Sequence, residues 1–212
     1  MAIRSLVVGA CVAASVCLSG AAHAAVFTYG SVATDTNHGS SLAFSSGGVS
    51  GTITAELTGI GSGMASPAII EEVGDGLGIR SSWIDPDDDI DSEGFEETMV
   101  FTFDRVVQLD FITFGDVDSD DDWTISVNGT TVNSQSDPFY FSNYFSNIWA
   151  DTFTVSAFRD GLLGLNADDS FTIQSFGASV VPLPAAAWFL LTAVGGLFGG
   201  RWLRGSRGAA AA

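Results

Sequence analysis

The sequence contains no lysine and few basic residues of any kind. Its 212 residues include 25 aspartates and glutamates against seven arginines, which gives a formal net charge of −18. Nucleic-acid binding depends on basic side chains that neutralise phosphates, so this composition argues against that class of protein. Yet 46% of the residues are hydrophobic, more than a disordered acidic chain would contain. Hydrophobic and acidic residues therefore occupy different segments.

The N-terminal segment is typical of a secretory signal peptide. Arg4 precedes an apolar run over residues 6–18, and Ala22-His23-Ala24 has the A-x-A form of a cleavage site. We expect residues 1–24 to be removed, so that the mature chain begins at Ala25. The alternative is an uncleaved anchor, although the apolar run is shorter than the roughly 20 residues that span a bilayer.

Cysteine and histidine are scarce, which removes most catalytic chemistries. Cys11 and Cys17 leave with the signal peptide, so an exported chain must be stabilised by its core or by ions instead of disulfides. His38 is then the last histidine, too few for a usual zinc site. A Ser-His-Asp triad would need His38 held firmly, whereas it lies in a predicted flexible loop. Carboxylate pairs suited to glycoside hydrolysis arise by chance among so many acids. We therefore predict that the protein is not an enzyme.

A second apolar segment lies near the C-terminus. No charged residue occurs from Val180 to Gly200, and arginines follow at 201, 204 and 207. About 20 apolar residues with arginines on one side predict a transmembrane helix whose arginine side is cytoplasmic. The alternative is a buried helix of a soluble domain.

The same segment carries a short motif at its start. The motif residues and the basic residues after the apolar stretch are Val181, Pro182, Leu183, Pro184, Ala185, Arg201 and Arg204. This arrangement resembles the PEP-CTERM sorting signal in its VPLPA variant, although the commonest form has glutamate where Leu183 stands. The resemblance covers residues 181–207 and leaves 208–212 as a tail. It implies recognition by an exosortase, a membrane transpeptidase-like enzyme, and delivery to the surface or extracellular matrix of a Gram-negative bacterium.

The remaining residues, 25–180, form the predicted ectodomain, and their apolar pattern has a period of two. Such alternation predicts half-buried antiparallel strands, and no window has a convincing helical period. The windows are 97–103, 107–111, 123–127, 151–157 and 170–175, with a weaker one at 49–57. Asn128-Gly129 after the third window predicts a hairpin whose second strand begins near Thr130.

This pattern predicts an all-β fold, a jelly-roll-like antiparallel β-sandwich of about eight strands, with a barrel as the alternative. The 14 phenylalanines of the ectodomain provide a core without disulfides. We expect Met99, Phe101 and Phe103 to share one face, and likewise Val107, Leu109 and Phe111. Residues 76–129 also resemble, more loosely, the globular part of many sorting-tail proteins.

The acidic residues gather in two segments, 85–97 and 116–122. Such crowding is unfavourable unless water, salt or a cation screens it, and calcium favours oxygen ligands in irregular loops. An EF-hand is rejected because Ile90 stands where that loop needs glycine. The candidate calcium ligands are Asp85, Asp87, Asp89, Asp91, Asp116, Asp118, Asp120 and Asp122. On an extended segment the last four would point one way, and in a sandwich both segments could converge at one edge. The alternative is solvated charge.

Aromatic side chains are candidates for stacking on sugars. They are Trp83, Trp123, Trp149, Tyr140 and Tyr144. The run 139–145 is too aromatic for a simple alternating strand, and core or edge packing is the alternative interpretation of it.

From the two ends and the composition, we predict an exported protein that an exosortase-type system sorts to the cell surface or extracellular matrix. Its predicted role is that of a structural, biofilm component. The alternative is a calcium-assisted carbohydrate-binding module. The predicted partners are the exosortase, the membrane before processing and an extracellular polysaccharide.

Overall fold

The computed structural model describes residues 24–58, 68–81, 88–92, 96–158 and 169–180, together with Val194. The chain divides into two compact units, and the strands all belong to the unit Ala22–Val181. The other unit, residues 1–21 and 182–212, contains Val194 as its one described residue. Within the described part of the chain, no helix is long and apolar enough to cross a membrane.

The described residues form an all-β structure with antiparallel pairing throughout and one short helix, α1 (Phe141–Tyr144). The strands are β1 (Ala24–Thr28), β2 (Thr36–Gly39), β3 (Ser41–Ser46), β4 (Val49–Thr58), β5 (Ile69–Val73), β6 (Gly76–Arg80), β7 (Ile90–Asp91), β8 (Glu96–Gly115), β9 (Trp123–Val127), β10 (Thr130–Ser134), β11 (Phe139–Tyr140), β12 (Trp149–Ala157) and β13 (Ser170–Val180). All six predicted windows lie in these strands. Strands β1, β2, β3, β5, β6, β7 and β11 were not predicted, because their segments are short or rich in glycine and polar residues.

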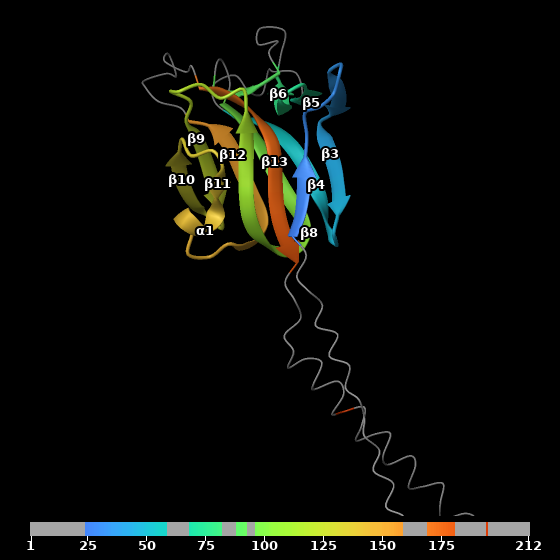
Figure 1. Ribbon diagram of the computed structural model, residues 1–212, viewed down its shortest axis with the longest axis vertical. Coiled ribbons are helices and arrows are strands. Elements are labelled where there is room, and N and C mark those ends of the chain that lie inside the picture. The colour runs from blue at the N-terminus through green and yellow to red at the C-terminus, as the bar shows by residue number, and fades with distance from the viewer. Residues whose placement is uncertain are drawn as a thin grey trace, which may run out of the picture. The chain divides into compact units, whose positions relative to one another are not determined.

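The long strand β8 joins the two layers of a sandwich-like arrangement (Figure 1). Its first half pairs with β4 on one side and β12 on the other. From Val107 onward it pairs with β13, and β11 adds to its other edge. Between the halves the pairing with β12 is irregular and residues 104–106 are exposed. The predicted windows 97–103 and 107–111 are therefore one interrupted strand.

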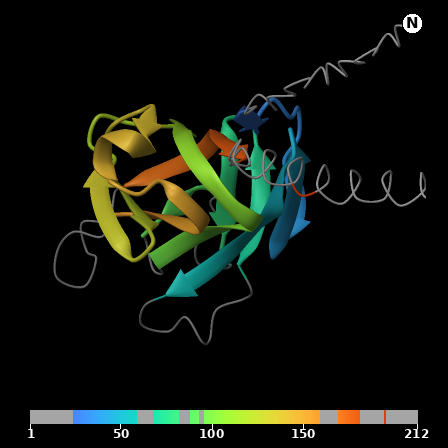
Figure 2. The ribbon, with the colours of Figure 1, turned by 90° about the horizontal axis from the view of Figure 1, so that it is seen from below.

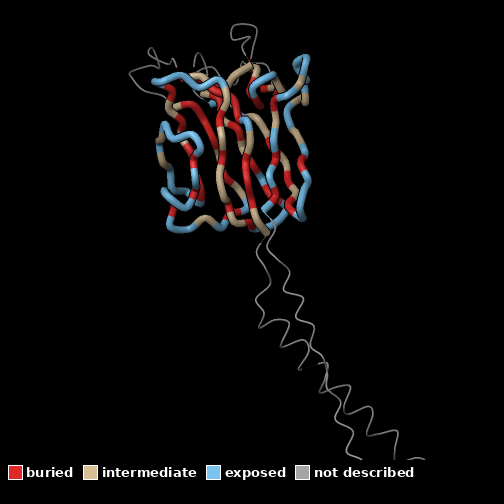
Figure 3. The backbone as a smooth tube through the Cα atoms, in the orientation of Figure 1, coloured by how far each residue is buried: buried red, intermediate tan, exposed pale blue. Residues whose placement is uncertain are grey.

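The core between the layers consists largely of phenylalanine rings. Phe176 of β13 stacks on Phe27 at 4.7 Å between ring centroids and meets Phe44 and Phe101 edge-on at 5.2 and 5.0 Å. Phe101 stacks in turn on Phe153 at 4.4 Å. Seen from below, the strands enclose this core (Figure 2), and buried positions alternate with exposed ones along them (Figure 3). Each buried phenylalanine contributes about 1.5–3 kcal/mol, so the fold does not depend on disulfides.

Met99, Phe101 and Phe103 are buried on one face, as predicted, but the prediction for Phe111 was wrong. The β13 residues that face Leu109 and Phe111 are adjacent, so Asp110 is an extra residue in β8. This bulge reverses the alternation, as an added residue in one strand must. Phe111 therefore lies on the outer side and Ile112 takes its place in the core.

The predicted hairpin is present. Asn128 and Gly129 have positive φ angles of 51° and 75°, as both central residues of a type I′ turn require. Thr130 pairs with Val127, so β10 begins where the sequence indicated.

Candidate functional site

The two acidic segments meet at the first residue of β13, as expected for a sandwich. The Ser170 hydroxyl donates a hydrogen bond to Asp89 Oδ2 at 3.0 Å, and the Ser170 N–H donates to Asp121 Oδ1 at 3.1 Å. One residue earlier, Asp169 Oδ1 accepts the N–H of Asp122 at 2.8 Å. The Asp89 and Asp121 carboxylates thus bind the hydroxyl and N–H groups of Ser170 and join both segments to the start of β13.

Within the second segment the buried carboxylate belongs to Asp121, which the sequence did not single out. It is 4% exposed and also accepts the N–H of Asp118. The alternation expected for an extended segment is wrong here, because Asp116 has a φ of 52° and a turn follows at 119–120. Asp116, Asp118 and Asp120 are therefore exposed, and Asp122 is half-buried.

The described residues include no group of three or more histidine, cysteine, aspartate or glutamate side chains placed to hold a metal ion. Asp89 is half-buried and Asp91 is buried. The candidate ligands Asp85 and Asp87 lie outside the described residues. Calcium binding therefore stays a prediction.

A second carboxyl cluster, unpredicted, lies on β5. Glu71 is 4% exposed, forms an ion pair with Arg80, and accepts a hydrogen bond from Asn37 Nδ2 at 3.2 Å. Burial raises the pKa of the Glu71 carboxyl, and the hydrogen bond and charge of Asp88 raise it further, while Arg80 acts in the opposite direction. The fold thus places Asp88 beside a buried carboxyl whose protonated form is favoured.

Glycine at position 78 makes this pair possible. Gly78 lies directly opposite Glu71 in the β5–β6 pair, and the Asp88 carbonyl occupies the space that a Cβ on residue 78 would need. Because Gly78 has no side chain, the segment at 88–89 runs close over β6, where the Ile79 N–H donates to the Asp89 carbonyl at 3.1 Å. Two successive acids in the otherwise apolar residues 69–73 were the available signal, although alternation places Glu72, and not Glu71, on the side of the buried Ile70.

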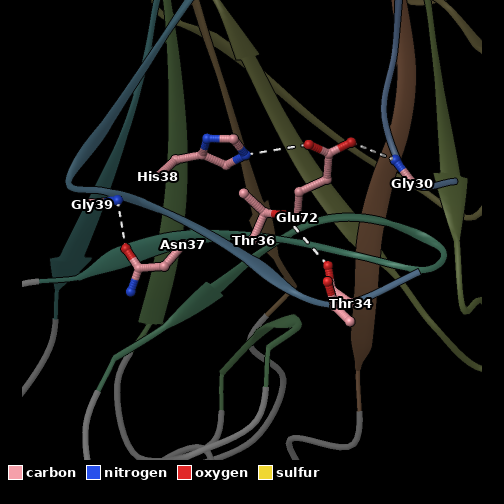
Figure 4. Close-up of polar contacts among 7 residues, drawn as sticks. All are labelled: Gly30, Thr34, Thr36, Asn37, His38, Gly39 and Glu72. Carbon is pink, nitrogen blue, oxygen red and sulfur yellow. Dashed lines mark hydrogen bonds and ion pairs between the residues drawn. The ribbon is translucent and has the colours of Figure 1, made fainter. Parts of the chain in front are cut away.

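The neighbouring carboxylate, Glu72, organises the chain between β1 and β2 (Figure 4). Its Oε2 lies 3.2 Å from His38 Nε2, and its Oε1 accepts the N–H of Gly30 at 3.2 Å. The expectation of a flexible, solvent-exposed histidine was wrong, because His38 is half-buried in β2 and paired with Glu72. Burial, with a smaller effect from the charge of Glu72, raises the pKa of Tyr29.

The aromatic candidates separate by exposure. Trp123 is fully buried and stacks on Phe114 at 4.0 Å, so it offers no face to a ligand. Tyr140 and Trp149 are 48% and 38% exposed. Tyr144 is exposed at its edge but stacks on the buried Phe139 ring at 4.4 Å, and hydrogen bonds with Ser134 and Ser136 lower its pKa. Trp83 lies outside the described residues.

The predicted signal-cleavage and sorting residues come directly before and after the domain in the sequence. β1 begins at Ala24, and Ala25 is buried opposite Ala178 of β13. β13 ends at Val180, so the strands that begin and end the domain pair with each other. Ala22 and the motif residues lie outside the described residues: Val181, Pro182, Leu183, Pro184, Ala185, Arg201 and Arg204.

Comparison of the chain with family models, with curated proteins and with solved structures finds no significant match.

Proposed function

We propose that the chain is exported, sorted by an exosortase-type enzyme through residues 181–207, and displayed at the cell surface or in the extracellular matrix as a structural component. The observation that carries the proposal is the order of motif, apolar stretch and arginines, placed directly after the folded domain. The last strand ends at Val180, and the motif begins at Val181. Cleavage within the motif would therefore leave the described strands intact.

The domain's charge distribution supports display. β13 has 11 residues, which span about 33 Å. The tail follows one end of this strand, whereas the acidic segments meet at Ser170, the other end. Repulsion between the acidic ends would keep displayed molecules apart. We take the sandwich to be of the jelly-roll type.

The experiment is expression in a Gram-negative host with and without an exosortase, with separate epitopes before residue 130 and after residue 207. We expect loss of the C-terminal epitope and surface exposure of the domain only when the enzyme is present. A Pro182→Ala/Pro184→Ala variant should keep both epitopes in the membrane fraction. Identical fractionation in both hosts would overturn the proposal.

The alternative, a calcium-assisted carbohydrate-binding module, is favoured by the meeting of both acidic segments at Ser170. Calcium titration of the full chain, followed by thermal unfolding, tests its metal component. A rise in Tm at millimolar calcium, absent with magnesium, would support it. No change in Tm would remove calcium from the proposed function and leave the sorting proposal as it stands.

A further inference from the structure

The layer formed by β1, β13, the second half of β8 and β11 carries exposed aromatic and polar side chains on its outer face, in two rows across the strands. Directly opposite residues in an antiparallel pair point to the same side of the sheet, so the pairing register identifies the side chains that lie in one row. One row runs Val26, Gly177, Phe111 and Tyr140, across β1, β13, β8 and β11. The next runs Ala24, Ser179, Gln108 and Trp149, ending on β12. Figure 1 shows β13 and β8 side by side in this layer.

The bulge in β8 places a carboxylate between these rows. Asp110 is the extra residue, and both it and Phe111 are half-buried between the buried Leu109 and Ile112. Asp110 Oδ2 accepts the Ser179 hydroxyl at 2.6 Å, and Oδ1 accepts Gln108 Nε2 at 3.4 Å. The carboxylate is therefore held in one orientation and keeps lone pairs for further donors.

Gly177 keeps the middle of the face flat. A Cβ on Gly177 would come 2.5 Å from Phe111 Cε1, so the ring lies against the glycine backbone. On either side of it, Val26 is 50% exposed and Tyr140 is 48% exposed, while Trp149 of the second row is 38% exposed. Tyr140 and Trp149 face positions three residues apart on β8, about 7–10 Å along the strand.

We propose that this face binds an uncharged polysaccharide. Aromatic rings provide surfaces for the C–H faces of sugar rings, and the Asp110, Gln108 and Ser179 groups between them match hydroxyls. The spacing of Tyr140 and Trp149 exceeds one sugar ring, which favours a polymer over a monosaccharide. A protein partner is less well matched, because polar groups separate the exposed rings, whereas the centres of protein interfaces are depleted in charge.

The charge of the chain decides between kinds of polysaccharide. The two rows and the bulge between them contain one carboxylate, Asp110, and no basic side chain. With seven arginines against 25 acids, the chain repels anionic polymers. The ligand is therefore neutral. This inference concerns binding by the purified chain and does not depend on exosortase processing.

The test is depletion of the full chain, purified in a mild detergent, by beads that carry hydroxyethylcellulose, laminarin, dextran or galactomannan, with alginate as the anionic comparison. We expect at least one neutral polymer to deplete the protein and alginate to fail. Trp149→Ala and Tyr140→Ala should each weaken binding at least about fivefold. Tyr140→Phe, which keeps the ring, should bind as the wild type does.

Val117→Ala is the control for the loss of an exposed hydrophobic side chain off these rows and should leave binding unchanged. Unfolding transitions within about 2 °C of the wild type establish that each variant is folded. Three binding results would overturn the proposal: no depletion by any neutral polymer, preference for alginate, or unchanged binding by the double variant Trp149→Ala/Tyr140→Ala. Light scattering that shows a dimer dissociated by Trp149→Ala would also overturn it. The last result would mean that a second copy covers the face.

Discussion

The carbonyl of Asp88 lies where a side chain on Gly78 would have to be. Because the obstacle is backbone, it cannot move aside without displacing the segment at 88–89 and its hydrogen bond to Ile79. The glycine at 78 thus fixes the course of a segment that belongs to the first acidic cluster and delivers Asp88 to Glu71.

We predict that Gly78→Ala destabilises the protein by about 3 kcal/mol or more, because overpacking against backbone has no inexpensive relief. Gly177→Ala is the matched comparison. The atoms that it would meet belong to the half-exposed Phe111 ring, which can rotate outward, so we expect a loss of about 1 kcal/mol. Denaturant unfolding of the full chain measures both, and equal losses would contradict this account.

The raised pKa of Glu71 predicts a pH dependence of stability. Relative to an ordinary carboxyl with a pKa of 4.5, the folded state favours the protonated form. The contribution of Glu71 to folding is therefore most favourable below pH 4.5 and is lost as the pH rises through the raised pKa of the folded state. Glutamine cannot ionise, so this loss of stability is absent from the Glu71→Gln variant. The Tm of the variant should therefore rise relative to that of the wild type as the pH increases above 4.5.

Thermal unfolding from pH 4 to pH 8 measures that difference. Glu56→Gln, at an exposed position on β4, is the control for the removal of one negative charge. Parallel Tm profiles for wild type and Glu71→Gln would show that the buried carboxyl has no such effect.

A third prediction concerns the hydrogen bonds through which Asp121 holds the second acidic segment and joins it to Ser170 of β13. Asp121→Asn should lower stability by about 1–3 kcal/mol, because an amide cannot accept both the Asp118 and the Ser170 N–H groups as the carboxylate does. Asp120→Asn removes the same charge from an exposed neighbour and should change stability by less than about 0.5 kcal/mol. If charge repulsion dominated the segment, both variants would instead be stabilised alike.

The hairpin between β9 and β10 allows a fourth prediction. Gly129 has a φ of 75°, and a Cβ added there would meet nothing within 4 Å, so Gly129→Ala probes backbone strain alone. We expect a loss of about 1–2 kcal/mol, the usual penalty for the left-handed conformation. Asn128→Gly relieves the same constraint at the preceding residue but removes the Asn128 Nδ2 hydrogen bond to the Trp149 carbonyl. Denaturant midpoints distinguish the two effects, and an unchanged midpoint for Gly129→Ala would refute the strain argument.

The alternation of side chains was sufficient to place six strand segments, and the Asn128-Gly129 pair placed the hairpin turn. It worked for Met99, Phe101 and Phe103 because a regular strand has a fixed period of two. It failed at Phe111 because one extra residue reverses the period, and the register of a partner strand decides where that residue lies. At Trp123 the alternation held, since Ile125 and Val127 on the same face are also buried, and it was the role in sugar stacking that was wrong.

By itself, then, the sequence determined the all-β class and the presence of two acidic clusters, both of which follow from local composition and period. Tertiary structure decided which carboxylates are buried. Asp121 and Glu71 are identical in kind to their exposed neighbours, and only long-range contacts with Ser170 and Asp88 set them apart. The aromatic face likewise exists only because β1, β13, β8 and β12, distant in the chain, pair in one register.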